Sequence, residues 1–241
     1  MDFEAILFDL GNTLVTQTVK EKNLMLKALE KIDLKTKSTL QEDDESSLRR
    51  LSSIYVKLYR DMDYLRETFL IEIPIDVWLN NLLIQTYDKE IAASVIDFAK
   101  ETVIEARSSF VKTYDKVANM LKELKKDYRL GIISNVSSEE VVYQIVSNLN
   151  IDHFFEVIVT SAGFGVRKPY PGIFYYALRG LGVEKIKSVI FVGDSMIHDI
   201  KGAKKLGMKT ILISNYKEKS NEADITIDEV RKVIDVIPNL C

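Results

Sequence analysis

The stretch Ala5-Ile6-Leu7-Phe8-Asp9-Leu10-Gly11-Asn12-Thr13 near the N-terminus decides the predicted fold. Its apolar first half predicts a short buried strand, which we place at residues 4–9. Its second half gathers small polar residues where that strand ends, and ligands of open α/β sheets bind outside the carboxyl ends of the strands. Asp9 could simply cap the following turn, but its place at the strand end favours a functional carboxylate. We predict that it is a nucleophile.

The second half of the chain alternates short apolar runs with helical segments. We predict strands at 130–134, 157–160, 189–192 and 210–213, with a possible short edge strand at 225–227. Strands that alternate with helices form a parallel sheet covered on both faces, so the strand at 4–9 must join this sheet from the far end of the sequence. The expected fold class is therefore α/β, with a doubly wound parallel sheet that is interrupted once.

The interrupting segment, residues 16–107, shows helical periodicity and no comparable strand. One apolar stripe at alternating spacings of three and four predicts a helix-packing seam: Leu48, Leu51, Tyr55, Leu58, Met62 and Leu65. Pro74 suits the first position of another helix, and the acidic run 42–45 suits a solvated helix start better than a metal site. We expect an all-helical insert whose aromatic residues belong to its own core rather than to a pocket: Tyr55, Tyr59, Phe69, Trp78 and Tyr87.

Composition limits the class of protein and its partners. The chain has 241 residues, 46% hydrophobic and 29% charged, without an 18-residue apolar run, so we expect a soluble protein of the cytoplasm. A net charge of -3, with both signs interspersed, offers no basic stripe for nucleic acid or for a membrane surface, and a small-molecule ligand fits better. The single cysteine, Cys241, excludes an intramolecular disulfide and a cysteine-rich metal cluster. The sequence indicates no oligomeric state.

Two further predicted strand ends carry polar groups that could bind an anion. Ser134 and Asn135 end the strand at 130–134, where a hydroxyl and backbone N–H groups can hold an oxyanion, although an ordinary strand-to-helix cap fits equally well. Lys168 lies in a loop that Pro169 and Pro171 stiffen, so its side chain should be held in place. Taken alone, however, a lysine is most simply a solvated charge.

Two carboxylates follow the predicted strand at 189–192. Asp194 leaves that strand, and Asp199 comes in the first turn of the next predicted helix. This pair suits Mg²⁺, which takes one or two protein carboxylates together with waters and phosphate oxygens. Asp199 could instead be a residue that the dipole favours at a helix start.

Taken together and in this order, the segments around Asp9, Ser134, Lys168 and Asp194 resemble the four motifs of the haloacid dehalogenase superfamily, whose members are mostly Mg²⁺-dependent phosphohydrolases. The resemblance spans the chain. It implies a Rossmann-like core, residues 1–15 and 108–241, with the helical insert 16–107 as a cap domain. It also implies an aspartyl phosphate on Asp9, a small phosphorylated substrate and a set of site residues. The catalytic residues would be Asp9 and Lys168, the substrate-binding residues Thr13, Ser134, Asn135 and Lys168, and the metal ligands Asp9, Gly11, Asp194 and Asp199.

The chain departs from this family at Gly11, where the usual pattern has a second aspartate that protonates the leaving group and then activates water. The backbone carbonyl of Gly11 can still bind the metal, but proton transfer is lost, and general acid/base catalysis contributes about 10²–10⁴ in rate. We therefore expect a preference for good leaving groups, such as aryl and acyl phosphates. Two alternatives stay open: a 2-haloacid dehalogenase-type hydrolase, against which Asp194 argues, and a phospho-ligand-binding protein with little turnover.

Overall fold

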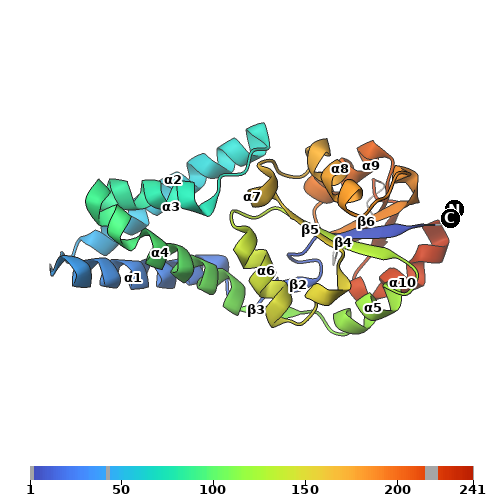
Figure 1. The fold of residues 1–241 in the computed structure, drawn as a ribbon, viewed down its shortest axis with the longest axis horizontal. Helices are drawn as coiled ribbons and strands as arrows, with labels where there is room; N and C mark the ends of the chain where they lie inside the picture. The colour runs from blue at the N-terminus through green and yellow to red at the C-terminus, as the bar shows by residue number, and fades with distance from the viewer. Residues whose placement is uncertain (1–2, 42–43, 215–221, 241) are drawn as a thin grey trace.

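The computed structural model describes residues 3–41, 44–214 and 222–240, and six strands of this part form one parallel sheet (Figure 1). Along the sheet their order is β5-β4-β1-β6-β7-β8. The strands are β1 (Ala5–Phe8), β4 (Arg129–Ser134), β5 (Val157–Thr160), β6 (Val189–Gly193), β7 (Lys209–Ile213) and β8 (Ile225–Ile227). The prediction of a parallel α/β sheet joined by an N-terminal strand is confirmed, and the short edge strand is present.

Helices cover both faces of the sheet because successive strand residues point to opposite sides. Ile6 and Phe8 of β1 belong to one buried apolar cluster, whereas Ala5 and Leu7 belong to another. Figure 1 shows α8 (Pro171–Gly180) and α9 (Gly202–Leu206) on one side of the sheet, and α5 (Val117–Leu124), α6 (Glu139–Asn148) and α10 (Val233–Val236) on the other. All residues of β1 are fully buried, as expected for a strand at the centre of a doubly covered sheet.

The position of β1 within the sheet creates the place where a ligand can bind. Phe8 lies opposite Ile132 of β4 on one side and Val192 of β6 on the other. From β1 the sheet extends through β4 and β5 in one direction and through β6, β7 and β8 in the other. Such a switch point leaves a crevice at the carboxyl ends of the strands.

The insert between β1 and the rest of the sheet is helical, as expected. In its described residues it consists of α1 (Glu21–Leu40), α2 (Ser47–Phe69), α3 (Ile75–Thr86) and α4 (Lys89–Ser109). The apolar stripe of α2 faces the other helices, with Leu51 and Met62 buried. The residue limits of the two domains, 1–15 with 108–241 and 16–107, stay a prediction.

Two local expectations for the insert need adjustment. Pro74 is not the first residue of α3 but the residue before it, with extended backbone, and the helix begins at Ile75. Of the acidic run 42–45, the first two residues lie outside the described part of the chain, and Asp44 precedes α2 and accepts a hydrogen bond of 2.8 Å from the Ser46 N–H. Cys241 also lies outside the described residues.

A short antiparallel ribbon, which the sequence did not predict, joins the cap to the core. It consists of β2 (Val15–Gln17) and β3 (Val111–Thr113), where the chain leaves the core and returns to it. Each strand has only three residues, too few to show a period of two. The partners are also far apart in sequence, so only the folded chain brings them together.

The cap contacts the core at a second place, between α2 and α3. Ile71 forms an antiparallel bridge with Val166. The flanking hydrogen bonds run from the Glu72 N–H to the Gly165 carbonyl, 3.0 Å, and from the Arg167 N–H to the Leu70 carbonyl, 2.7 Å. This contact fixes the cap against the loop that carries Lys168. The cap and the core are therefore joined on both sides of the space between them.

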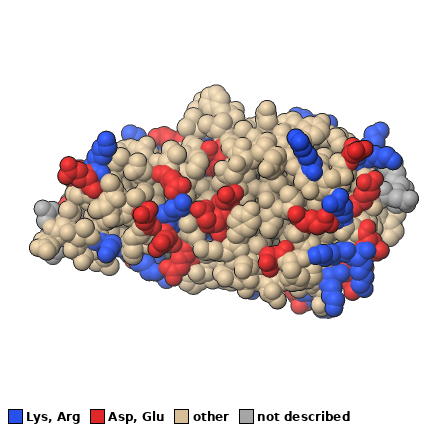
Figure 2. Space-filling model, in the orientation of Figure 1, with Lys and Arg blue, Asp and Glu red and all other residues tan. Residues whose placement is uncertain are grey.

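The visible surface agrees with the near balance of charges. On the face in Figure 2, acidic and basic side chains are interspersed over most of the molecule, and basic side chains gather at the end of the core remote from the cap. Among the described residues, no helix is both long enough and apolar enough to cross a bilayer.

Candidate active site

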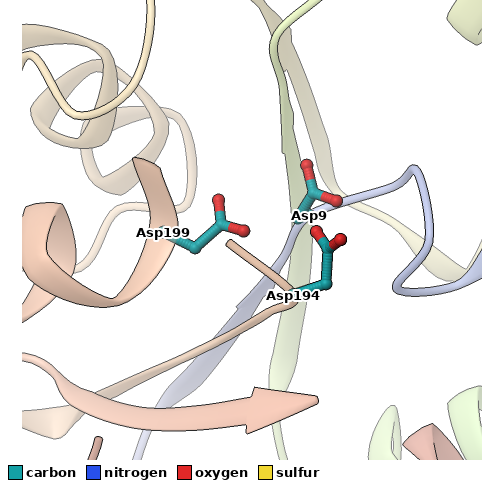
Figure 3. A group of neighbouring side chains, drawn as sticks. All are labelled: Asp9, Asp194 and Asp199. Atoms are coloured by element: carbon teal, nitrogen blue, oxygen red, sulfur yellow. The ribbon is translucent and has the colours of Figure 1, made fainter. Parts of the chain in front are cut away.

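Four segments of the core bring their polar residues to the crevice beside β1. Asp9 directly follows β1, and its N–H donates to the Val192 carbonyl at 2.9 Å, which continues the pairing with β6 for one residue. Ser134 is the last residue of β4, and Asp194 follows the end of β6. Figure 3 shows the carboxylates of Asp9, Asp194 and Asp199 converging from β1, β6 and the turn after β6.

Lys168 lies between two of these carboxylates, those of Asp9 and Asp199. Its side chain is 1% exposed, and its Nζ lies 2.7 Å from Asp9 Oδ1 and 2.7 Å from Asp199 Oδ1. Nζ also donates to the Ile133 carbonyl at 2.7 Å. Burial by itself lowers the pKa of Lys168, but the two carboxylates outweigh burial and raise it above its ordinary value. The side chain is therefore a fixed positive charge beside the proposed nucleophile.

Asn135 holds Lys168 in this position. The Lys168 N–H donates to Asn135 Oδ1 at 2.8 Å, and Asn135 Nδ2 donates to the Lys168 carbonyl at 3.1 Å. Both ends of the amide are thus used to fix the loop, a contact that the predicted role in phosphoryl binding did not include. Ser134 is buried beside Asn135 and lines a small cavity of about 180 Å³ above Asp9.

The carboxylate cluster carries more negative charge than Lys168 can balance. The pKa of Asp9 is raised to about 7, mainly by burial; Lys168 lowers it, whereas the neighbouring Asp199 and Asp194 contribute to the rise. The pKa of Asp194 is likewise raised, first by burial and then by Asp199. Three carboxylates share one ammonium group, so a site that excludes water needs another positive charge.

Asp199 is held by its own turn and by close packing. It lies in a π-helical turn, Met196–Lys201, and its Oδ2 accepts a hydrogen bond of 2.9 Å from the Ser195 N–H. Gly193 makes room for it, because a Cβ at that position would lie 2.4 Å from Asp199 Oδ2. The glycine at the end of β6 is therefore required by the close approach of a site carboxylate.

The residues fit a divalent cation. Asp9, Asp194 and Asp199 each offer an oxygen, and these oxygens lie within 4.8 Å of one another. Hard oxygen donors of this kind are those that Mg²⁺ prefers, and Mg²⁺ completes its coordination with waters and phosphate oxygens. The excess negative charge of the cluster points to the same ligand class.

Gly11 and Thr13, from the polar half of the opening motif, differ in what surrounds them. A Cβ on Gly11 would meet nothing within 4 Å, so the space for an acid/base side chain is open. Thr13 is fully buried, and its Oγ1 has no hydrogen-bond partner among the described residues. It lines a separate cavity of about 670 Å³ with Asp194, and it is not among the residues that line the small cavity above Asp9.

Another cavity, of about 390 Å³, lies between the core and the cap. Gly11, Ser134 and Asn135 line both this cavity and the small cavity above the carboxylates, so the two cavities adjoin. Charged residues from both parts of the chain line it: Glu21, Arg66, Arg107 and Arg167. Of the five cap aromatics, Trp78 is buried in the cap core as expected, but the prediction was wrong for Phe69, which is 59% exposed, and for Tyr59, which lines this cavity.

Sequence analysis missed the three arginines and also gave no role to His198. His198 lines the small cavity, and its Nε2 lies 3.2 Å from Oε2 of Glu67 on the cap helix α2. No local pattern could have found these residues, because they come from separate helices and loops.

Comparisons with known proteins agree with this geometry. Residues 38–213 match the sequence profile of the haloacid dehalogenase-like hydrolase family. The chain is 27% identical over 248 residues to a glyceraldehyde 3-phosphate phosphatase from Methanopyrus kandleri, an alignment that covers 98% of each chain. It is 30% identical over 147 residues to a phosphoglycolate phosphatase from Aquifex aeolicus, covering 60% of this chain and 68% of the relative.

Among solved structures, a 2-haloacid dehalogenase from Pseudomonas syringae shares the fold with a TM-score of 0.71 at 21% identity, covering 99% of this chain and 100% of the other. A dehalogenase therefore shares the fold of a chain whose sequence relatives are phosphatases, so the fold alone does not distinguish these activities. The profile match spans most of the chain and includes both cap and core. The chain belongs to the haloacid dehalogenase-like hydrolases.

Proposed function

We propose that this hydrolase is a Mg²⁺-dependent phosphatase that transfers the phosphoryl group of a small phosphorylated molecule to Asp9. One observation carries the proposal: the Asp9 carboxylate lies 2.7 Å from the buried Lys168 Nζ, with two further carboxylates gathered beside it. Relatives named for phosphatase activity support the same class.

The charges of the site suit attack on a phosphate. A carboxylate and a phosphate monoester repel each other, so positive charge must stand beside both. Lys168 supplies one such charge. Asp9, Asp194, Asp199 and the Gly11 carbonyl would hold Mg²⁺, which supplies the remaining charge neutralisation when bound.

The proposed reaction has two steps. An Asp9 oxygen forms a bond to phosphorus while the bond from phosphorus to the leaving oxygen breaks, giving an aspartyl phosphate and an alkoxide or phenoxide. Water then attacks the phosphorus and breaks its bond to the Asp9 oxygen, which releases inorganic phosphate and free Asp9. The proton that this water gives up to solvent balances the one that the alkoxide or phenoxide takes up. No side chain at Gly11 protonates the leaving oxygen, so a leaving group that departs without a proton should react faster.

The open alternatives are less well supported. A dehalogenase needs no metal beside its nucleophile, so the further carboxylate Asp194, which completes a cluster suited to a cation, argues against it. A phospho-ligand-binding protein would keep the same contacts but show no turnover. A location in the cytoplasm and the absence of a nucleic-acid partner stay predictions from composition.

Hydrolysis of p-nitrophenyl phosphate tests the proposal, because its leaving group needs no acid. We expect Mg²⁺-dependent release of p-nitrophenol by the wild type, and loss of activity both in Asp9→Asn and after EDTA treatment, with recovery of the treated sample on adding Mg²⁺. Arg60→Gln, on the exposed side of α2, is the control and should keep full activity. Activity that survives Asp9→Asn would contradict the role of Asp9, and no activity at all would leave a binding protein or a dehalogenase.

A further inference from the structure

Three arginines from different parts of the chain meet at the cavity between cap and core. Arg66 comes from α2, Arg107 from α4 and Arg167 from the core loop next to Lys168. Their side chains are 12%, 14% and 14% exposed, so water screens their charges poorly. The proposed reaction uses none of them.

Two of the arginines share one carboxylate. Glu72, whose side chain is 0% exposed, pairs with Arg66 at 3.0 Å and with Arg167. Its oxygens also accept hydrogen bonds from the Ile73 N–H at 3.1 Å and from Ser161 Oγ at 2.6 Å. Glu72 is therefore saturated with donors, and one carboxylate cannot neutralise two guanidinium groups.

Arg107 has little compensation either. Its Nη2 donates to Glu21 Oε1 at 3.0 Å and its Nη1 to Ser137 Oγ at 2.8 Å. The Glu21 side chain is 46% exposed, so solvent weakens that pair. The buried Nε of Arg107 has no hydrogen-bond partner among the described residues.

The arginines leave a positive charge in the cavity. Three guanidinium groups face the carboxylates of Glu21 and Glu72, which leaves one positive charge unbalanced. Burial holds the pKa of Arg66 below its ordinary value, and the nearby Arg167 and Arg107 act in the same direction, against the opposite effect of Glu72. A buried cluster with excess positive charge is stabilised by an anion, and guanidinium groups bind a carboxylate in a paired geometry.

We infer that Arg66, Arg107 and Arg167 bind a second anionic group of the substrate, a carboxylate, while its phosphate lies beside Asp9. The single unbalanced charge matches a monoanion better than a second phosphate. The cavity of about 390 Å³ shares the lining residues Gly11, Ser134 and Asn135 with the small cavity above Asp9, so a small molecule that spans these residues would contact both. The substrate class is then a small phosphorylated carboxylic acid. This inference rests on the proposed phosphatase function.

Ligand binding, measured with a variant that does not turn the ligand over, tests this inference separately from catalysis. The Asp9→Asn protein with Mg²⁺ is titrated calorimetrically with phosphoglycolate and with 2-hydroxyethyl phosphate, in which a neutral hydroxymethyl group replaces the carboxylate. We expect phosphoglycolate to bind about 10- to 100-fold more tightly, the value of a buried charge-assisted contact. Arg66→Gln in the same background should abolish most of this preference, and the matched Arg60→Gln should keep it.

Arg107→Gln provides a second test in case Arg66→Gln does not fold. Loss of this arginine should disturb the fold less, because the partners of Arg107 are a hydroxyl and a half-exposed carboxylate. Unchanged affinity for 2-hydroxyethyl phosphate shows that each variant is folded. Equal affinities for the two ligands, no binding of either, or a preference that survives both Arg66→Gln and Arg107→Gln would overturn the inference. A wild type that prefers phosphoglycolate but does not hydrolyse p-nitrophenyl phosphate would instead overturn the proposed function alone.

Discussion

Two buried charge clusters in this molecule are out of balance in opposite directions. At the strand ends, three carboxylates gather beside the single ammonium group of Lys168. Between cap and core, Arg66 and Arg167 pair with Glu72, and Arg107 pairs with Glu21. Buried charges are tolerated only when they are compensated. The same rule underlies both proposals, a cation for the first cluster and an anion for the second. The comparison teaches that net charge, counted over a buried cluster, indicates the class of ligand that the cluster is suited to bind.

Removing the ammonium group of Lys168 from the carboxylate cluster should have the largest effect on activity. We expect Lys168→Met to lower kcat/KM for p-nitrophenyl phosphate by about 10²–10³, because a fixed electrostatic contact to the transferred group is lost. The variant also leaves Asp9 and Asp199 without their shared partner, so its melting temperature should fall and should recover in part with Mg²⁺. Activity within a factor of two of the wild type would remove Lys168 from the proposed mechanism.

Removing the carboxylate of the arginine cluster is the matching test. Glu72→Gln breaks two buried ion pairs, and loss of one partner of a buried pair costs about 3–5 kcal/mol. We expect a lower free energy of unfolding in urea, and a larger stabilisation by added phosphoglycolate than in the wild type, because the cavity gains one positive charge. Glu101→Gln, exposed on α4, serves as the control and should change stability by less than about 0.5 kcal/mol. A Glu72→Gln protein with wild-type stability would mean that the two ion pairs of Glu72 do not compensate buried charge.

Restoring an acid beside the carboxylate cluster should raise activity. The open space at Gly11 accepts a side chain, so Gly11→Asp should fold, and it should increase kcat for an alkyl phosphate by up to about 10²-fold. The increase for p-nitrophenyl phosphate should be much smaller, because that leaving group departs without a proton. The test is to assay both substrates with the wild type and with Gly11→Asp. Equal acceleration of the two substrates would show that the added carboxylate acts on the metal site instead.

The pH dependence of Mg²⁺ binding should show directly the excess negative charge of the carboxylate cluster at the strand ends. The pKa of Asp9 is about 7 in the folded protein, above its ordinary value of 3.8, so the metal-free folded state holds a proton that the unfolded chain has lost. Stability without metal should therefore fall as pH rises from about 4 to about 7. Mg²⁺ must displace this proton, so its affinity should rise by up to about tenfold per pH unit below 7 and level off above.

Calorimetric titrations with Mg²⁺ and thermal melts in EDTA across this pH range measure both effects. Asp9→Asn should show a shallower dependence in each, with a remaining slope from Asp194, whose pKa is also raised. A Mg²⁺ affinity that does not change with pH in the wild type would place the metal away from Asp9.

The two clusters also differ in how far the sequence revealed them. The members of the carboxylate cluster come at the ends of apolar strands or in the turn after one, so local pattern and the order of the motifs identified Asp9, Asp194, Asp199 and Lys168. Asn135 was identified too, but its contact with the Lys168 backbone was not, because that hydrogen bond joins two loops 33 residues apart in the chain. The short ribbon β2–β3 was missed for the same reason.

The sequence by itself determined the parallel sheet, the place of the helical insert and the carboxylates at the strand ends. These features follow from hydrophobic periodicity and from the rule that strand ends meet at one edge, both of which act over a few residues. The tertiary structure alone decided which cap side chains face the core. Arg66, Arg107 and Arg167 meet only when α2, α4 and the loop before Lys168 are packed together, and no local pattern encodes a contact between such distant residues. The charge of the cavity is therefore a property of the folded chain.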